Sequence, residues 1–152
     1  VWDETTLTAR NLRKLNHEWQ RAAKALLTQI GLGDRLDDHP QKLSYGQKRR
    51  LNLVAALLHE PKLLLIDEFL IGQDMTNAHL WMDFFKQFTS LGRSIILVIH
   101  HPELIIKYCD RIIFLEEGNI KINEETRPAF NKLAEWNYYA FLPQGQWGLP
   151  DA

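Results

Sequence analysis

Apolar residues recur along the first part of this chain at the spacing typical of amphipathic helices. Residues 16–30 carry them every three or four positions, with Asn16 suited to cap such a helix and Gly31 suited to end it. A second helical pattern runs through residues 44–60 and stops before a proline. We therefore predict two helices here and assign no element to the mixed, polar residues 1–15.

Two later runs are apolar without alternation, which is typical of parallel strands covered on both faces. Residues 63–66 form the first run and residues 94–99 the second, with a helical pattern between them from about Asp74. Strand, helix and strand in this order are the unit of a parallel sheet. The stripe of this helix that we expect in the core is aromatic: Trp81, Phe84, Phe85 and Phe88.

The remainder of the chain predicts smaller elements. Residues 102–108 suit a short helix opened by a proline, and residues 111–122 suit a hairpin around Glu116-Glu117-Gly118. A last helix is expected over residues 129–140. Prolines and glycines break any regular pattern from residue 143 onward, so we expect a loose tail.

These patterns divide the chain into three predicted parts. Residues 1–60 are a helical subdomain, residues 61–123 alternate strands with helices, and residues 124–152 hold the last helix and the tail. The predicted fold class is therefore α/β, with parallel strands and helices plus a helical subdomain. A chain of 152 residues with 45% hydrophobic residues is long enough to bury a core.

Charge and the length of the apolar runs exclude several classes of protein. The chain has 18 Lys and Arg against 19 Asp and Glu, so it lacks the positive excess of a bulk nucleic-acid binder. Its apolar runs are far shorter than the roughly 18 residues that span a bilayer. A single cysteine excludes an internal disulfide, and no leader pattern opens the chain, so we expect a cytosolic protein.

The segment Leu43-Ser44-Tyr45-Gly46-Gln47 opens the second predicted helix. Ser44 and Gln47 have the S-x-x-Q spacing of a capping box, which is a purely structural explanation. The same segment would also suit a phosphate, because a hydroxyl, a glycine that permits close approach and free N–H groups meet at the positive end of a helix. Both interpretations remain open from this segment alone.

Two acidic residues, Asp67 and Glu68, directly follow the first predicted strand. Open α/β sheets place ligands at the carboxyl ends of their strands. One carboxylate could hold Mg²⁺ while the next polarises a water for attack on a phosphoryl group, although a solvated acidic turn is an equal alternative. His100 ends the second strand, where an imidazole could contact a phosphate or hold a catalytic water, or be structural.

Taken in order, these segments resemble the ATPase domain of the ABC family. The ordered set consists of Leu43 to Gln47, residues 63–68, Gly72-Gln73-Asp74 and His100. The resemblance covers roughly residues 1–123 and implies a partial P-loop NTPase fold. The stretch from Asp67 to Asp74 is most similar to ATPase subunits of energy-coupling-factor transporters, which import vitamins and metal ions.

The resemblance implies a role for each matching residue that binds nucleotide or metal. Ser44, Gly46 and Gln47 would belong to the signature motif, which binds the γ-phosphate of ATP held by the partner subunit. Asp74 would be the aspartate of the loop that crosses the dimer interface. Asp67 would be the acidic residue of the magnesium site.

The resemblance also implies the catalytic residues, cofactors and partners. Glu68 would be the general base for the attacking water, and His100 the switch histidine that contacts the γ-phosphate, with ATP and Mg²⁺ as cofactors. The partners would be a second ATPase subunit, in a homo- or heterodimer, and a transmembrane coupling subunit on which residues 1–60 dock. We then expect a peripheral protein on the cytoplasmic face of the membrane that neither inserts into it nor binds nucleic acid.

The sequence departs from the commonest family pattern at several side chains and at one motif. Tyr45 replaces a glycine, Phe69 and Leu70 replace Pro-Thr, and His101 replaces a polar or acidic residue. None of the eight glycines is followed by Lys, so the phosphate-cradling sequence G-x-x-x-x-G-K-[ST] is absent from these 152 residues. We expect that sequence upstream, in which case the chain is the second part of a nucleotide-binding domain.

Three functional hypotheses follow from these observations. The favoured one is an ATP-hydrolysing subunit that closes as a dimer around ATP and magnesium and powers a membrane transporter, with this chain inactive alone. The second is a non-catalytic interaction or docking module of an ABC ATPase. The third is an ABC ATPase of DNA maintenance, against which the net charge of -1 and the lack of long heptad repeats argue.

Overall fold

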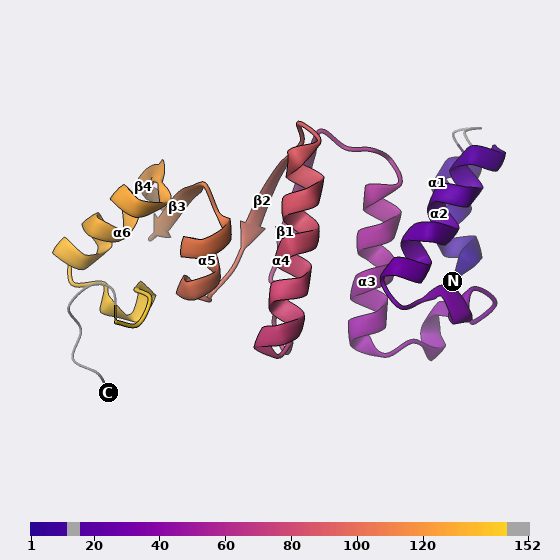
Figure 1. The fold of residues 1–152 in the computed structure, drawn as a ribbon, viewed down its shortest axis with the longest axis horizontal. Coiled ribbons are helices and arrows are strands. Elements are labelled where there is room, and N and C mark those ends of the chain that lie inside the picture. Colours follow the sequence, from indigo (N-terminus) through magenta and orange to yellow (C-terminus); the bar gives the residue numbers. More distant parts are fainter. Residues whose placement is uncertain (12–15, 146–152) are drawn as a thin grey trace. The chain divides into compact units, whose positions relative to one another are not determined.

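The computed structural model describes residues 1–11 and 16–145 (Figure 1). The chain divides into two compact units, Val1–Leu64 and Leu65–Ala152. The boundary between them falls inside strand β1 (Leu63–Asp67), a few residues after the predicted end of the helical subdomain. Within the described ranges, no helix combines the length and the apolar character that crossing a membrane requires.

The first unit is helical, and each of its two predicted helices is confirmed. Its helices are α1 (Trp2–Asn11), α2 (His17–Gln29) and α3 (Tyr45–Leu57), with the short 3-10 turns η1 (Gly33–Arg35) and η2 (Pro40–Lys42) between α2 and α3. Helices α1 and α2 both pack against α3. The side chains buried on these helices include Ala9, Ala23, Leu27, Leu51 and Val54.

The caps predicted for α2 are present at both of its ends. Asn16 Oδ1 accepts the backbone N–H of Trp19 at 2.8 Å. Gly31 has a φ of 74°, in the left-handed region that glycine adopts freely and that commonly ends helices. The guanidinium of Arg50, from α3, donates to the carbonyl oxygen of Ile30 at 3.2 Å and so ties the end of α2 to α3.

Helix α1 lies in a segment for which the sequence pattern predicts no element. Its buried face includes Thr5 and Thr6, which are 3% and 0% exposed. Their hydroxyl groups donate to the carbonyl oxygens of Val1 and Trp2, four residues earlier. Because these bonds satisfy the hydroxyl groups, the threonines can be buried, and a pattern that counts threonine as polar does not detect the face they form.

The second unit begins with the predicted strand, helix and strand. Strands β1 and β2 (Ser94–Val98) form a two-stranded parallel sheet, and helix α4 (Met75–Ser90) connects them and lies against β2. This confirms the predicted α/β fold class. The predicted aromatic stripe of α4 is only partly correct, because Trp81 and Phe84 are half-buried. The buried side chains of α4 are Ala78, Met82, Phe85 and Phe88.

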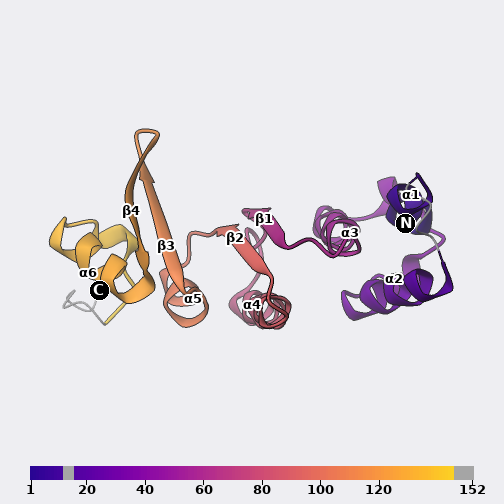
Figure 2. The same ribbon diagram turned by 90° about the horizontal axis from the view of Figure 1, so that it is seen from above.

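The sheet differs from the expectation that both of its faces are covered. Ile66 on β1 is buried, but its neighbour Leu65 is 70% exposed, and Ile96 and Val98 on β2 are 48% and 46% exposed. Figure 2 shows α4 on one side of β2. Among residues 65–145, no element covers the other side, so the strands are apolar on a face that this part of the chain leaves open.

The predicted short helix and hairpin are confirmed in the rest of the second unit. They are helix α5 (Pro102–Tyr108) and the antiparallel strands β3 (Arg111–Glu116) and β4 (Asn119–Glu125). The last helix, α6 (Thr126–Glu135), begins and ends earlier than predicted. It ends early because the positive φ of 63° at Asn137 turns the chain toward the short η3 (Tyr139–Phe141). Most of the predicted loose tail, residues 146–152, lies outside the described residues.

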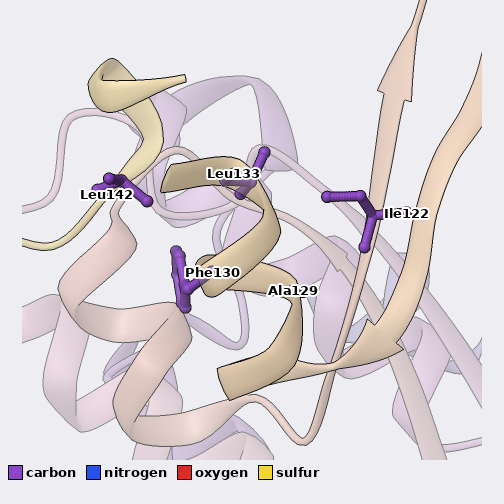
Figure 3. Close-up of a cluster of buried hydrophobic side chains, with 5 residues drawn as sticks. All are labelled: Ile122, Ala129, Phe130, Leu133 and Leu142. Carbon is purple, nitrogen blue, oxygen red and sulfur yellow. The ribbon is translucent and has the colours of Figure 1, made fainter. Parts of the chain in front are cut away.

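Helix α6 covers one face of the β3–β4 hairpin and forms a small core with it. Figure 3 shows the buried members of this core: Ile122, Ala129, Phe130, Leu133 and Leu142. The hydroxyl of Thr126 donates to the carbonyl oxygen of Cys109, which ties the start of α6 to the end of α5. The hairpin therefore has a covered face and an exposed one, and the exposed face carries Ile113, Leu115 and Ile120.

Candidate functional site

The first group of candidate residues lies at the N-terminus of α3, in the helical unit. Ser44 Oγ accepts the backbone N–H of Gln47 at 3.3 Å, and Gln47 Oε1 accepts the backbone N–H of Ser44 at 2.9 Å. The predicted capping box is thus present. The capping box satisfies the backbone N–H groups of Ser44 and Gln47. Other N–H groups of this exposed first turn have no acceptor within the helix.

Nothing in the fold requires a glycine at position 46. Apart from its two chain neighbours and the backbone of its own helix, a Cβ at this position would meet no described heavy atom within 4 Å. Within a helix, glycine is less favourable than alanine by roughly 1 kcal/mol. A glycine in open space at a helix N-terminus leaves room for a ligand to approach the backbone closely.

Tyr45, which departs from the family pattern, lies on the surface of the same turn. Its ring is 73% exposed, and the guanidinium carbon of Arg49 lies 4.9 Å from the ring centroid. A cation over an aromatic face at this distance is attracted to it. The contact joins residues one turn apart on α3, so the bulky ring is held by its own helix.

The second group lies at the carboxyl ends of β1 and β2, in the α/β unit. His100 Nε2 and Glu68 Oε1 are 3.4 Å apart, although the residues are 32 positions apart in the sequence. The structure therefore brings together the two residues predicted to be catalytic. Their side chains are 62% and 46% exposed, so this long contact is weak and readily exchanged for others.

The backbone at Glu68 has a conformation that the sequence does not predict. Its φ is 49°, a left-handed value that costs a non-glycine residue roughly 1–2 kcal/mol. The N–H of Ile71 donates to the carbonyl oxygen of Glu68 at 3.2 Å and closes a turn. Phe69, inside this turn, is 8% exposed. In the sequence, the buried ring corresponds to an aromatic residue directly after the acidic pair, before a helix with an aromatic stripe; this pattern does not indicate the backbone conformation of Glu68.

Asp74 caps α4, and this local role accounts for its geometry. Asp74 Oδ1 accepts the backbone N–H of Asn77 at 2.9 Å, and Oδ2 accepts the side-chain N–H of the same residue at 2.6 Å. These two bonds hold the pKa of Asp74 below its ordinary value of 3.8, because they favour the ionised form. The carboxylate is therefore charged at neutral pH, and its negative charge is favourable at the positive N-terminal end of α4.

Asp67 is an exposed carboxylate at the end of β1. In the described part of the chain, no three His, Cys, Asp or Glu side chains are grouped so that they could hold a metal ion. Mg²⁺ at nucleotide sites is commonly held by one or two carboxylates, waters and phosphate oxygens. Asp67 thus fits a single ligand of nucleotide-bound magnesium and does not fit a metal site built by the protein alone.

Comparison with known proteins agrees with the observed fold. The family model described as ABC transporter matches residues 1–70. The chain is 36% identical over 121 residues to a putative hemin import ATP-binding protein, HrtA, of Staphylococcus epidermidis. That match covers 80% of this chain and 54% of the relative, so the chain spans about half of the relative's length.

Two solved structures share the arrangement of elements. One is an ATP-binding subunit of an ABC transporter, with a TM-score of 0.77 and 25% identity over 91% of this chain and 60% of the other. The second is cbiO1 of Clostridium perfringens, part of the ABC transporter complex cbiONQ, with a TM-score of 0.68 and 25% identity over 91% of this chain and 56% of the other.

The fold is that of a partial α/β P-loop NTPase domain. Within that class, the chain is part of an ABC-family ATPase domain, which confirms the resemblance seen in the sequence.

Proposed function

We propose that this chain supplies the signature motif, the catalytic base and the switch histidine of an ATP-hydrolysing subunit that powers a membrane transporter. The observation that supports this most directly is the approach of Glu68 to His100, 3.4 Å apart at the carboxyl ends of adjacent strands. We interpret this contact as part of a site for ATP hydrolysis because similar proteins are ATP-binding subunits of ABC transporters.

In this proposal the chemistry at the strand ends belongs to Glu68 and His100. Bound Mg-ATP supplies the phosphoryl group that is transferred to water. Glu68 accepts the proton of the attacking water as a general base, and its exposed carboxylate leaves space for that water. His100 turns its Nε2 from Glu68 toward the γ-phosphate, an exchange that costs little because their contact is long and exposed.

In this proposal the remaining candidate residues bind magnesium, contact ATP or meet the second subunit. Asp67 provides one oxygen ligand to magnesium, and Ser44, Gly46 and Gln47 contact the γ-phosphate of ATP held by a second subunit. The open space over Gly46 supports this role. Asp74, charged and fixed on Asn77, lies in the loop that meets the other subunit.

The finer proposal is import of vitamins or metal ions by an energy-coupling-factor type of transporter. It is supported by the stretch from Asp67 to Asp74 and by the similarity to cbiO1, part of the cbiONQ complex. The complete protein would then bind a second ATPase subunit and a transmembrane coupling subunit on the cytoplasmic face of the membrane. Complexes isolated from detergent-solubilised membranes through the complete protein are expected to contain both partners, and recovery of the ATPase subunit alone would contradict this.

The assignment of Glu68 as the base is tested by Glu68→Gln in the complete protein. Loss of a general base is expected to lower the rate of ATP hydrolysis by about 100-fold or more and to leave ATP binding intact. Glu117→Gln is a matched control, because Glu117 is also exposed and has a φ of 48°, but lies in the hairpin turn. Unchanged hydrolysis in Glu68→Gln would rule out this role.

A second candidate function is favoured by the absence of G-x-x-x-x-G-K-[ST] from these 152 residues. On its own, the chain would be a non-catalytic docking module of an ABC ATPase. Titration of the 152-residue chain with labelled Mg-ATP tests this candidate, which predicts no binding in the micromolar range. Micromolar affinity would exclude it.

A further inference from the structure

We propose that Phe69 is a positioning residue for Glu68. Its ring, held by the aromatic side chains of α4, fixes the turn that presents the Glu68 carboxylate to His100. This inference rests on the proposed role of Glu68 as the catalytic base. It gives a function to a residue that otherwise only marks a departure from the family pattern, which has proline at this position.

The turn after β1 needs an anchor, because its first residue has an unfavourable backbone conformation. Glu68 has a φ of 49°, and non-glycine residues keep such a value only where their surroundings determine it. The N–H of Ile71 donates to the carbonyl oxygen of Glu68 at 3.2 Å, and that of Gln73 donates to Leu70 at 3.1 Å. These bonds close the turn but do not attach it to the rest of the unit.

Phe69 attaches the turn to α4, beside Leu70, which is 4% exposed. Its ring centroid lies 4.8 Å from that of Trp81 with the planes at 80°, and 5.8 Å from that of Phe85 with the planes at 69°. Both are edge-to-face contacts, the arrangement that aromatic pairs favour. Trp81 and Phe85 are one turn apart on α4 and so form one surface. Phe69 is 8% exposed, so its ring is held within this cluster.

The position of Phe69 determines the direction of Glu68 because the two residues share a peptide unit. A proline after Glu68 would restrict the backbone of the preceding residue sterically, through its ring. Phenylalanine imposes no such restriction, so in this chain the restriction comes from packing against α4. The Glu68 side chain is 46% exposed, and its weak contact with His100 does not hold it alone. The anchored turn therefore sets the direction of the carboxylate.

The test compares Phe69→Ala with Phe84→Ala in the complete protein. Phe84 is a matched control, because it belongs to the same cluster, with ring centroids 5.8 Å from Trp81 and 5.9 Å from Phe85, but lies on α4 and not next to Glu68. Phe69→Ala is expected to lower kcat for ATP hydrolysis by about 10-fold or more with little change in KM, since small displacements of a catalytic group cost up to about 100-fold. Phe84→Ala is expected to leave kcat within about two-fold.

A third variant, Phe69→Leu, keeps a buried apolar anchor in case Phe69→Ala does not fold. Its kcat is expected to lie between those of the wild type and Phe69→Ala. Equal kcat values for Phe69→Ala and Phe84→Ala would overturn the proposal, because the effect would then come from loss of the cluster in general. Wild-type kcat in both Phe69 variants would overturn it as well.

A second readout does not depend on hydrolysis. The NMR signals of the Glu68 Cα and of the Glu68 and His100 amides are expected to move in Phe69→Ala and to stay in place in Phe84→Ala. If Glu68→Gln leaves hydrolysis unchanged, the proposed function fails, while these signals still test the positioning. If Glu68→Gln abolishes hydrolysis but Phe69→Ala changes neither kcat nor these signals, the positioning alone is wrong.

Discussion

Gly46 is a residue at which the requirements of the fold and of the proposed function differ. Apart from its chain neighbours and the backbone of its own helix, a Cβ there meets no described heavy atom within 4 Å, and alanine is favoured over glycine in a helix. Gly46→Ala is therefore expected to raise the free energy of unfolding by up to about 1 kcal/mol. It is also expected to lower ATP hydrolysis in the complete protein, because the methyl group occupies the space for the phosphate. Chemical denaturation and a hydrolysis assay measure the two effects.

Gly33→Ala is the control for this prediction. A Cβ at Gly33 would lie 2.8 Å from Thr28 Oγ1 and 3.2 Å from Thr28 Cα, so this substitution is expected to destabilise the helical unit. If Gly46→Ala stabilises the protein and leaves hydrolysis at the wild-type level, the signature role of Gly46 is wrong.

Cys109 is expected to react slowly with alkylating reagents. Burial, followed by the negative charge of Asp110, raises the pKa of its thiol from 9.0 to about 11. Because the thiolate is the reactive form, alkylation by iodoacetamide near pH 8 is expected to be about 100-fold slower than in the unfolded chain. Mass spectrometry of samples taken over time measures both rates. Equal rates in the folded and unfolded chain would show that burial does not protect this thiol.

At the scale of elements, the cap of α4 is expected to make this helix sensitive to acid. Because the folded pKa of Asp74 is depressed, its stabilising effect is present above the ordinary value of 3.8 and is lost as the pH falls through the folded pKa. Asp74→Asn keeps a side-chain oxygen that can cap the helix but does not titrate. The variant is expected to lose less stability than the wild type on acidification, as measured by thermal unfolding across pH.

Asp74→Ala removes both the capping oxygen and the charge, whereas Asp74→Asn removes only the charge. The Asp74→Ala variant is expected to be less stable than the wild type at neutral pH, because no side chain then accepts the N–H of Asn77. Identical pH dependence in the wild type and Asp74→Asn would contradict the prediction that this carboxylate couples α4 to pH.

The elements that the sequence predicts well are those with local signals. Asn16 and Gly31 bound α2, and Ser44 with Gln47 opens α3, because these residues bond to backbone only a few positions away. Helix α1 has no such signal, since its threonines are buried through bonds to their own backbone. The end of α6 depends on a positive φ at a non-glycine residue, which no simple pattern predicts.

At the scale of the whole molecule, the two compact units are expected to respond separately to loss of a core residue. Phe130 is 1% exposed in the core between α6 and the hairpin, so Phe130→Ala is expected to cost about 3–5 kcal/mol. Hydrogen exchange is expected to show loss of protection in β3, β4 and α6, with little change in α1, α2 and α3. Phe141→Ala is the control, because Phe141 is 46% exposed. Equal loss of protection in both units would contradict this expectation.

The candidate site was predictable where topology brings residues together. Glu68 and His100 follow two strands of one parallel sheet, and the carboxyl ends of such strands meet at one edge. For Ser44 and Asp74, capping accounts for the observed bonds, and the patterns that predict a cap also occur where a helix binds phosphate. The turn at Glu68 was not predictable, because its anchor is a packing contact with α4 and not a turn residue.

The left-handed backbone at Glu68 also bears on protein engineering. A redesign guided only by stability would replace such a residue with glycine or asparagine, which adopt a positive φ at lower cost. At position 68 that change would delete the carboxylate assigned to catalysis. Glu60 and Glu117 have similar φ values of 50° and 48° and carry no proposed role in catalysis. A thermostabilised variant should therefore be sought at those two positions, with Glu68 kept as it is.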